Sequence, residues 1–324
     1  MAKNNALLVR IASLYFENGV NQNEIAEICG IERSRVSRLL LQARNLGIVQ
    51  FHVVDPTSKN EELSSMLQEK YFLQNAIVFN TLSIPENQLK KTIGLVAADY
   101  VVSTVKERDV LAISWGESVL HTIQGLDIEE PRNLTVVPAI GGSDLISPAY
   151  HINEMVRLVV NKLGGIRRTL YAPAFVESKQ MRDSILNLKD IKTVTDLWKN
   201  VTLALVGIGK SPFTYRSRKG ENMQFGQFYL EDFEQHELLE MGVMGDINSR
   251  FFGVNGEELP AGIHDRIIGM NLNELHKVPL VIGVAGGAGK VDAIRAALHG
   301  GVLNVLITDS ETARQILSGV NKNN

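Results

Sequence analysis

The sequence has almost no cysteine and no long apolar run, and each absence excludes a class of protein. One cysteine, Cys29, in 324 residues cannot form an intramolecular disulfide, so a disulfide-stapled fold is excluded and a reducing compartment is expected. No apolar stretch approaches the roughly 20 residues that a membrane-spanning helix needs, and the first residues lack the pattern of a signal peptide. We therefore expect a cytoplasmic protein without membrane contact.

A strong excess of charge is missing as well. The formal net charge is −3, so no basic field surrounds the whole protein, and any nucleic-acid site must concentrate its positive charge locally. The seven histidines are scattered without the spacing of metal ligands. We therefore expect no metal site.

Two glycine-rich stretches look like nucleotide-binding motifs but fail in detail. The stretch that ends at Lys290 has Val284 where a P-loop needs its first glycine, and Val291 where the loop needs Ser or Thr. The pair of glycines at 207–209 begins a dinucleotide fingerprint, but Pro212 stands where its third glycine belongs. We therefore expect no cofactor.

The chain is long enough for two domains, one of them large. The pattern predicts a helix-turn-helix domain over residues 1–56 and an effector-binding domain over 75–320. A polar break at 55–60 separates them. Residues 57–74 then form a linker or a dimerisation helix, because apolar residues recur there at helical spacing: Leu63, Met66, Leu67 and Phe72.

Residues 19–41 have the pattern of a helix-turn-helix. Ala26 is small where the two helices cross, Ile25 and Ile28 are expected to face inward, and Gly30 is expected in the left-handed conformation of the turn. Glu32 is a weaker helix cap than Ser or Thr. The next helix, from about 32 to 45, presents arginine and serine, which contact guanine edges and phosphates. The candidate DNA contacts are Gln22, Arg33, Ser34, Arg35, Ser37 and Arg38.

Three further expectations concern this first domain. Residues 48–54 alternate like a strand and predict a small wing. Reading two DNA half-sites requires symmetry, so we expect at least a dimer. The alternative is a plain three-helix cap whose arginines face solvent, but that reading does not explain three arginines within six residues after a glycine turn.

From about residue 75 strands alternate with helices, which predicts an α/β fold with a mainly parallel sheet covered on both faces. Ligands of such sheets bind outside the carboxyl ends of the strands. The expected strands are 76–79, 110–114, 134–140, 169–172, 204–208, 280–284 and 304–308, and the expected helices are 88–105, 152–163, 291–299 and 311–317.

An ordered set of blocks along nearly the whole chain resembles the SorC-type (SorC/DeoR-like) sugar-responsive regulators. The blocks are residues 22–26, 35–40, 47–49, 114–118, 141–143, 150–153, 172–174, 204–209, 245–252 and 289–290. The resemblance implies a winged helix-turn-helix, a Rossmann-like domain related to phosphosugar isomerases, and a homodimer or homotetramer. It further implies a regulator of a carbohydrate-utilisation operon whose partners are operator DNA and a phosphorylated sugar effector.

Physical reasoning and the resemblance both select candidate effector contacts. Amides of the turn Gly141–Ser143 form an expected phosphate nest, and Lys290 opens a helix whose N-terminus attracts the same anion. Asp246 and Asn153 are candidates for sugar hydroxyls, and Arg250 for a second anion or as partner of Asp246. In the family pattern Asp246 and Lys290 match ligand-contacting positions, and Gly141, Gly142 and Ser143 match a phosphate loop.

Each candidate has a structural alternative. Glycine pairs after strands are often just tight turns, Lys290 alone is a solvated lysine, Asp246 and Arg250 fit one face of a strand, and Asn153 fits a brace for its helix. Two other functions also stay open. One is a sugar-phosphate isomerase-like enzyme with Asp246 as its base, although no second positioned acid is evident. The other is a regulator of an unphosphorylated sugar or polyol.

Overall fold

The computed structural model describes residues 2–16, 18–49, 58–81, 86–143, 150–211 and 230–319. The chain separates into two compact units, Met1–Val54 and Asp55–Asn324. Each unit is a separate body and is described by itself. The division falls within two residues of the boundary at residue 56 that the sequence predicts.

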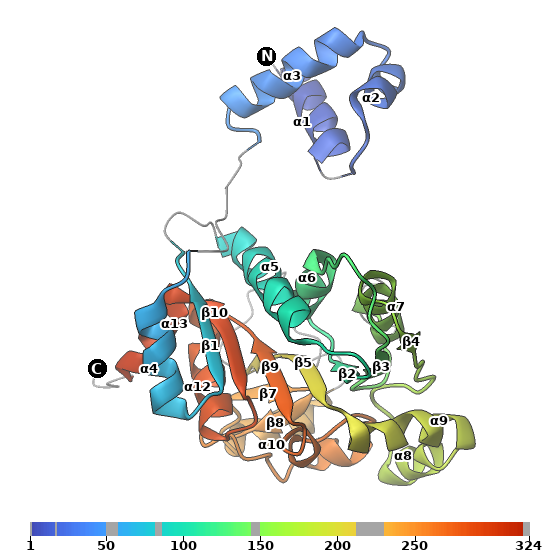
Figure 1. Ribbon diagram of the computed structural model, residues 1–324, viewed down its shortest axis with the longest axis vertical. Helices are drawn as coiled ribbons and strands as arrows, with labels where there is room; N and C mark the ends of the chain where they lie inside the picture. The colour runs from blue at the N-terminus through green and yellow to red at the C-terminus, as the bar shows by residue number, and fades with distance from the viewer. Residues whose placement is uncertain are drawn as a thin grey trace. The chain divides into compact units, whose positions relative to one another are not determined.

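The first unit contains three helices, α1 (Ala2–Phe16), α2 (Gln22–Cys29) and α3 (Arg33–Asn45) (Figure 1). The Asn21 side chain accepts hydrogen bonds from the amides of Asn23 and Glu24, and Glu24 completes a capping box that begins α2. Gly30 ends α2 at φ 63° and ψ 38°, as predicted for the turn. The core between the helices consists of Leu8, Ile11, Ala12, Ile25, Val36, Leu39, Leu40 and Ala43.

Ile28 does not face inward, because its side chain is 51% exposed and Ile25 alone is fully buried on α2. Ile28 follows Ile25 by three residues, which turns its side chain about 60° away from that of Ile25 around the helix axis. The expected wing lies mostly outside the described residues, and the part that is described, Ile48 and Val49, forms a bend.

The second unit is built on a seven-stranded sheet with the order β1-β10-β9-β5-β2-β3-β4, in which every neighbouring pair is parallel. A smaller antiparallel sheet has the order β6-β7-β8. The strands are β1 (Asn75–Phe79), β2 (Val110–Ile113), β3 (Thr135–Pro138), β4 (Ile166–Arg167), β5 (Leu203–Gly207), β6 (Gly209–Lys210), β7 (Gly245–Ile247), β8 (Arg250–Phe252), β9 (Leu280–Val284) and β10 (Val305–Asp309).

The strand expected at 169–172 is wrong, and the structure shows why. The strand hydrogen bonds to β3 are made earlier, by Ile166 and Arg167 of β4. At Leu170 the backbone N–H donates to Asn153 Oδ1, and its carbonyl accepts from Asn153 Nδ2, each at 3.0 Å. A side chain therefore takes the bonds that a neighbouring strand would need.

Helices cover both faces of the large sheet (Figure 1). Leu111 and Ile113 of β2 belong to the core cluster that contains α5, α6 and α7, whereas Ala112 between them belongs to the cluster that contains α4, α12 and α13. Successive side chains of a strand in a parallel sheet that is covered on both faces point into two apolar layers, so the strand is apolar along its whole length. The helices are α4 (Glu61–Tyr71), α5 (Glu86–Thr104), α6 (Glu117–Gly125), α7 (Ile152–Leu163), α8 (Lys179–Leu186), α9 (Lys189–Thr195), α10 (Asp232–Glu240), α11 (Leu272–Leu275), α12 (Val291–His299) and α13 (Ser310–Ser318).

Helix α4, expected as a linker or a dimerisation helix, is part of this second unit. Leu63, Leu67 and Tyr71 are buried in the core cluster beneath β1. Lys70 Nζ donates to the carbonyl of Leu317 at 3.0 Å, which ties α4 to α13. The chain's own sheet and helix therefore cover Leu63 and Leu67. Met66 and Phe72, the other apolar residues of the expected face, are 46% and 93% exposed, so a contact of α4 with a partner subunit stays a prediction.

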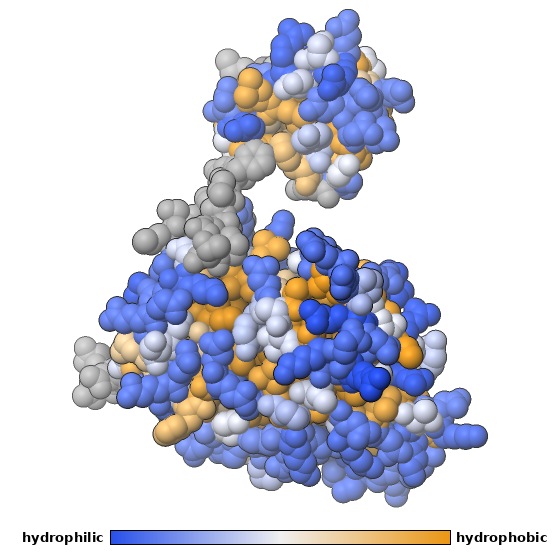
Figure 2. Space-filling model, viewed as in Figure 1, coloured by the Kyte–Doolittle hydropathy of each residue, from blue (hydrophilic) through white to orange (hydrophobic). Residues whose placement is uncertain are grey.

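The outside of the second unit is mainly polar. Hydrophilic side chains cover most of the face that Figure 2 shows, with apolar side chains visible between them. Among the described residues no helix has the length and apolar character needed to cross a membrane.

Candidate functional site

The candidate DNA contacts share the outer side of α2 and α3. Gln22, at the start of α2, is partly exposed, and the five contacts predicted on α3 are all exposed: Arg33, Ser34, Arg35, Ser37 and Arg38. Val36 and Leu40 point the other way, into the core. The sequence of α3 holds four arginines and no Asp or Glu, so this helix carries positive charge, whereas α2 contributes Glu24 and Glu27.

Glu32, the expected weak cap, is engaged elsewhere. Its side chain makes no cap hydrogen bond to α3, and its Oε2 accepts a bond from Ser34 Oγ at 3.2 Å. Within the described residues, no carboxylate forms an ion pair with Arg33, Arg35 or Arg38. Arg38 Nε donates to the carbonyl of Ser34 in its own helix at 3.4 Å. Guanidinium groups without a carboxylate partner are available to phosphates or guanines.

In the second unit, the chain reverses its direction of travel through the sheet between two neighbouring strands. From β2 it proceeds outward to β3 and β4, and from β5 it proceeds the other way to β9 and β10. This is a topological switch point, where open α/β sheets bind ligands at the carboxyl ends of the strands. The loops that leave those ends are 114–116 after β2, 139–143 after β3, and 285–290 after β9.

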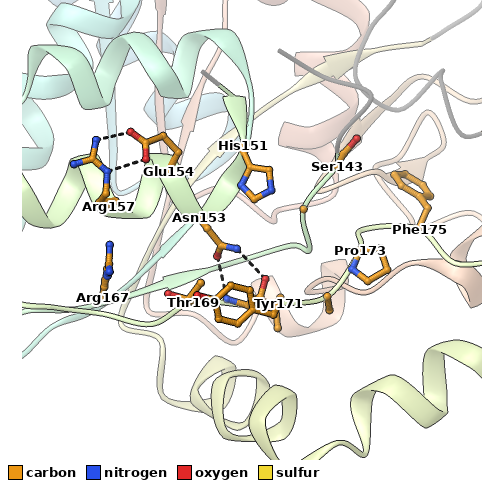
Figure 3. A pocket seen from close by; sticks show the side chains of 13 residues that line it. Ser143, His151, Asn153, Glu154, Arg157, Arg167, Thr169, Tyr171, Pro173 and Phe175 are labelled. Carbon is orange, nitrogen blue, oxygen red and sulfur yellow. Dashed lines mark hydrogen bonds and ion pairs between the residues drawn. The ribbon is translucent and has the colours of Figure 1, made fainter. Parts of the chain in front are cut away.

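One pocket at this edge, with a volume of about 750 Å³, lies beside β3, β4 and the start of α7 (Figure 3). It contains three of the expected effector contacts, Gly142, Ser143 and Asn153. The other residues that line it are His151, Glu154, Arg157, Arg167, Thr169, Leu170, Tyr171, Ala172, Pro173 and Phe175.

The expected phosphate nest at Gly141 and Gly142 is not formed. The amide of Gly141 donates to the carbonyl of Ile268, and the amide of Gly142 donates to that of Ala172, both at 2.9 Å. Glycine is required at 141 for a different reason, since a Cβ there would lie 2.5 Å from the backbone of Pro173. Gly141 thus permits close packing of the backbone onto residues 172–173, whereas a Cβ on Gly142 would lie 3.0 Å from His151 Nε2. Ser143 is the polar side chain of this turn.

Asn153 acts as a brace within the pocket. Its amide makes two hydrogen bonds with the backbone of Leu170, and these fix the loop that forms the opposite wall (Figure 3). Beside it, Arg157 forms two hydrogen bonds with Glu154, and these bonds hold the pKa of the Glu154 carboxyl below its usual value. His151, Arg157 and Arg167 were not predicted as site residues, because an isolated basic residue in a sequence gives no signal of a site.

Asp246 and Lys290 form a second group at the same edge, beside β5 and β9. Asp246 lies on β7 and pairs with Gly209 on β6, and Asp246 Oδ2 accepts from the amide of Ser249 at 3.1 Å. Lys290 is the N-cap residue of α12, at the end of the glycine-rich stretch, and its Nζ donates to the carbonyl of Ile208 at 2.7 Å. The positive charge of Lys290 lowers the pKa of Asp246, and the negative charge of Asp246 raises the pKa of Lys290.

Burial changes the acidity of both groups. Burial raises the pKa of Asp246 to about 6, although the Ser249 amide and the Lys290 charge oppose the change. Burial lowers the pKa of Lys290 to about 8, helped by Lys90 and opposed by Asp246. A carboxylate and an ammonium ion kept partly from water interact strongly with a polar ligand, because little solvent screens them.

Arg250, expected as an anion contact or as partner of Asp246, has a structural role instead. It is 6% exposed, and its guanidinium donates to the carbonyls of His264, Ile267 and Gly269 at 3.0, 3.3 and 2.9 Å. Its nearest carboxylate is Glu258, at 3.7 Å. Arg250 therefore holds together the segment 264–269 and does not belong to the candidate ligand contacts.

The two groups of candidate contacts lie on neighbouring parts of one edge rather than in one pocket. Between them lies Trp115, which follows β2 and stacks on Phe175 with ring centroids 6.5 Å apart, so it has a packing role. Glu117, at the start of α6, acts electrostatically on both Tyr150 and Lys290. No cluster of three or more possible metal ligands occurs in the described part of the chain.

Comparison with known proteins identifies the family. Residues 55–318 match the Sugar-bind family model, whose description is "Putative sugar-binding domain". The chain is 31% identical to the sorbitol operon regulator of Klebsiella pneumoniae, over 96% of this chain and 97% of that protein. The chain belongs to the SorC family of sugar-binding transcriptional regulators. Its relatives in this family are regulators and not enzymes, so the isomerase alternative is set aside.

Two further comparisons support the same assignment to the SorC family. The deoxyribonucleoside regulator of Bacillus subtilis (strain 168) is 31% identical, over 96% of this chain and 97% of that protein. The crystal structure of the full-length sorbitol operon regulator SorC from Klebsiella pneumoniae superimposes with a TM-score of 0.74 at 31% identity, covering 96% of this chain and 98% of that chain. The α/β fold predicted from the sequence is confirmed.

Proposed function

We propose that this SorC-family protein binds operator DNA of a carbohydrate-utilisation operon through α3 and releases or remodels that complex when a phosphorylated sugar binds in its second unit. The observation that carries the DNA-binding half is that Arg33, Arg35 and Arg38 of α3 are exposed and that none of these three forms an ion pair with a described carboxylate. A helix of this kind after a glycine turn fits the major groove.

The effector half rests on Asp246 and Lys290 at the switch point. Asp246 accepts hydrogen bonds from sugar hydroxyls, and Lys290 attracts the phosphate, assisted by the N-terminus of α12 that it begins. Ser143, in the pocket beside β3, is the third candidate contact. Asn153 contributes indirectly, by holding the wall of that pocket.

An effector controls DNA binding only if its affinity differs between the DNA-competent and DNA-incompetent states. We propose that the assembly is a homodimer or homotetramer, because one recognition helix reads one half-site and a symmetric pair reads two. Sedimentation of the protein with and without effector measures this directly, and a monomer at the concentrations that bind DNA contradicts it.

The decisive experiment measures binding to the DNA upstream of the protein's own gene by fluorescence anisotropy, with a panel of sugar phosphates and the matching free sugars. We expect a salt-sensitive complex that one phosphate ester weakens and its free sugar does not. A response to the free sugar alone would remove Lys290 from the phosphate role. Absence of any specific complex would contradict the operator assignment of this region.

A further inference from the structure

The exposed side of α3 has an apolar residue at its centre. Residues three or four positions apart share one face of a helix, so Ser34, Arg38 and Leu41 form one row along α3. The opposite face contains the buried Val36 and Ala43. Leu41 is 55% exposed, and it stands outside the core cluster of its unit. Packing within the described part of this unit therefore does not account for a leucine in this row.

The charge around Leu41 indicates what covers it. Helix α3 carries Arg33, Arg35, Arg38 and Arg44 and no acidic residue, so its outer side complements a polyanion. In the major groove the apolar group on the edges of the base pairs is the C5-methyl of thymine. A leucine that enters the groove among arginines therefore meets a thymine methyl.

We infer that Leu41 is a specificity residue that contacts a thymine methyl in each operator half-site. The inference rests on the proposed binding of DNA by α3. It goes beyond that proposal by naming one base of each half-site, a thymine, and the residue that contacts it. Leu41 follows Arg38 by three residues, which is about 4.5 Å along the helix axis. The thymine is therefore expected within one or two base pairs of the contact made by Arg38.

The test removes the methyl group from the DNA and the side chain from the protein. The half-sites are first located by footprinting with the full-length protein, and each thymine is then replaced in turn by deoxyuridine. At one position in each half-site we expect affinity to fall about fourfold, the value of one methyl-sized group leaving water. Leu41→Ala is expected to bind the thymine operator more weakly and to be insensitive to deoxyuridine at that position.

Leu46→Ala is the matched control. Leu46 is as exposed as Leu41, at 57%, but it caps the end of α3 and lies outside the row of Ser34 and Arg38. This variant is expected to keep the full deoxyuridine effect. Thermal unfolding of both variants is expected to match the parent, because neither side chain belongs to the core cluster.

Three outcomes overturn the inference. One is a specific complex that no deoxyuridine substitution weakens. Another is an undiminished deoxyuridine effect in Leu41→Ala. The third is a shift of Leu41→Ala toward smaller species in sedimentation, which would assign Leu41 to a subunit interface. In all three the protein still forms a specific complex, or its assembly is altered measurably. Absence of any specific complex would instead overturn the proposed function together with the inference.

Discussion

Gly209 lies directly opposite Asp246 in the pairing of β6 with β7, so closely that a Cβ on Gly209 would fall 1.8 Å from Asp246 Oδ1. No larger residue leaves room for the carboxylate in its present position. Gly209, the second glycine of the stretch 207–209, therefore leaves the space that the Asp246 carboxylate occupies. It does not have the role of a glycine that approaches a nucleotide phosphate.

The first prediction concerns this contact. Gly209→Ala is expected to keep the fold, because the clashing atom is the end of a side chain that rotates away, and to weaken effector binding at least tenfold by displacing the Asp246 carboxylate. Calorimetry with the effector and anisotropy with operator DNA measure the two functions separately. Gly262→Ala is the control, since a Cβ there meets only Glu237 Oε2, at 3.8 Å, and Gly262 does not belong to the candidate site. Unchanged effector affinity in Gly209→Ala would remove Asp246 from the site.

The second prediction is a pH dependence of effector affinity. Between about pH 6 and pH 8 both Asp246 and Lys290 are charged, since their pKa values are about 6 and about 8. Above pH 8 Lys290 loses its proton, and from pH 7 to pH 9 we expect affinity for a phosphate ester to fall about tenfold. Calorimetry at the two pH values measures it. Lys290→Met is expected to bind the phosphate ester weakly at both pH values. If affinity still falls from pH 7 to pH 9 in this variant, the pH dependence belongs to another group.

The same pKa shifts predict how stability depends on pH. The folded state binds more protons than the unfolded state between the ordinary pKa of Asp246, 3.8, and its raised value of about 6, so this group makes stability fall as pH rises through that range. Lys290 binds fewer protons when folded between about pH 8 and 10.5, so its contribution makes stability rise there. Denaturant unfolding of Asp246→Asn against the parent, from pH 4 to pH 7, isolates the first contribution.

Much of the fold was predictable because buried parallel strands and amphipathic helices leave local patterns. Helices 152–163 and 291–299 begin and end where their periodicity predicts. The strand predicted at 169–172 was wrong because a side chain distant in sequence, Asn153, bonds the backbone there. Local pattern contains no information about such a partner.

The candidate site was predicted less completely, for a related reason. Residue type indicates what a side chain is able to bind but not what already binds it. The amides of Gly141 and Gly142 and the guanidinium of Arg250 are all satisfied by carbonyls from other parts of the chain. Asp246 and Lys290 were selected because both match ligand-contacting positions of the family pattern. The structure places Asp246 on β7 and Lys290 before α12, close enough for the charge of each to act on the pKa of the other.

The third prediction separates phosphate contacts from base contacts on α3. Arg38→Ala is expected to weaken operator binding. If Arg38 contacts a phosphate, the slope of log affinity against log salt becomes about 0.9 smaller per half-site, and all sequences are affected alike. If it contacts guanine, discrimination against a substituted base is lost instead. Arg314→Ala is the control, since Arg314 is exposed on α13 and ion-paired with Glu311. An unchanged affinity in Arg38→Ala would exclude both roles.

The fourth prediction tests whether α4 belongs to the fold or to an interface. Leu67 is fully buried under β1, whereas its neighbour Met66 on the same helix is 46% exposed. Leu67→Ala is expected to lower the free energy of unfolding of the second unit by about 3 kcal/mol, because truncating a buried leucine leaves a cavity, while Met66→Ala changes it by less than about 0.5 kcal/mol. Denaturant unfolding measures both. A helix that instead joined two subunits would give another result: Leu67→Ala would shift the sedimentation equilibrium toward monomer, and its unfolding midpoint would depend on protein concentration more than that of the parent.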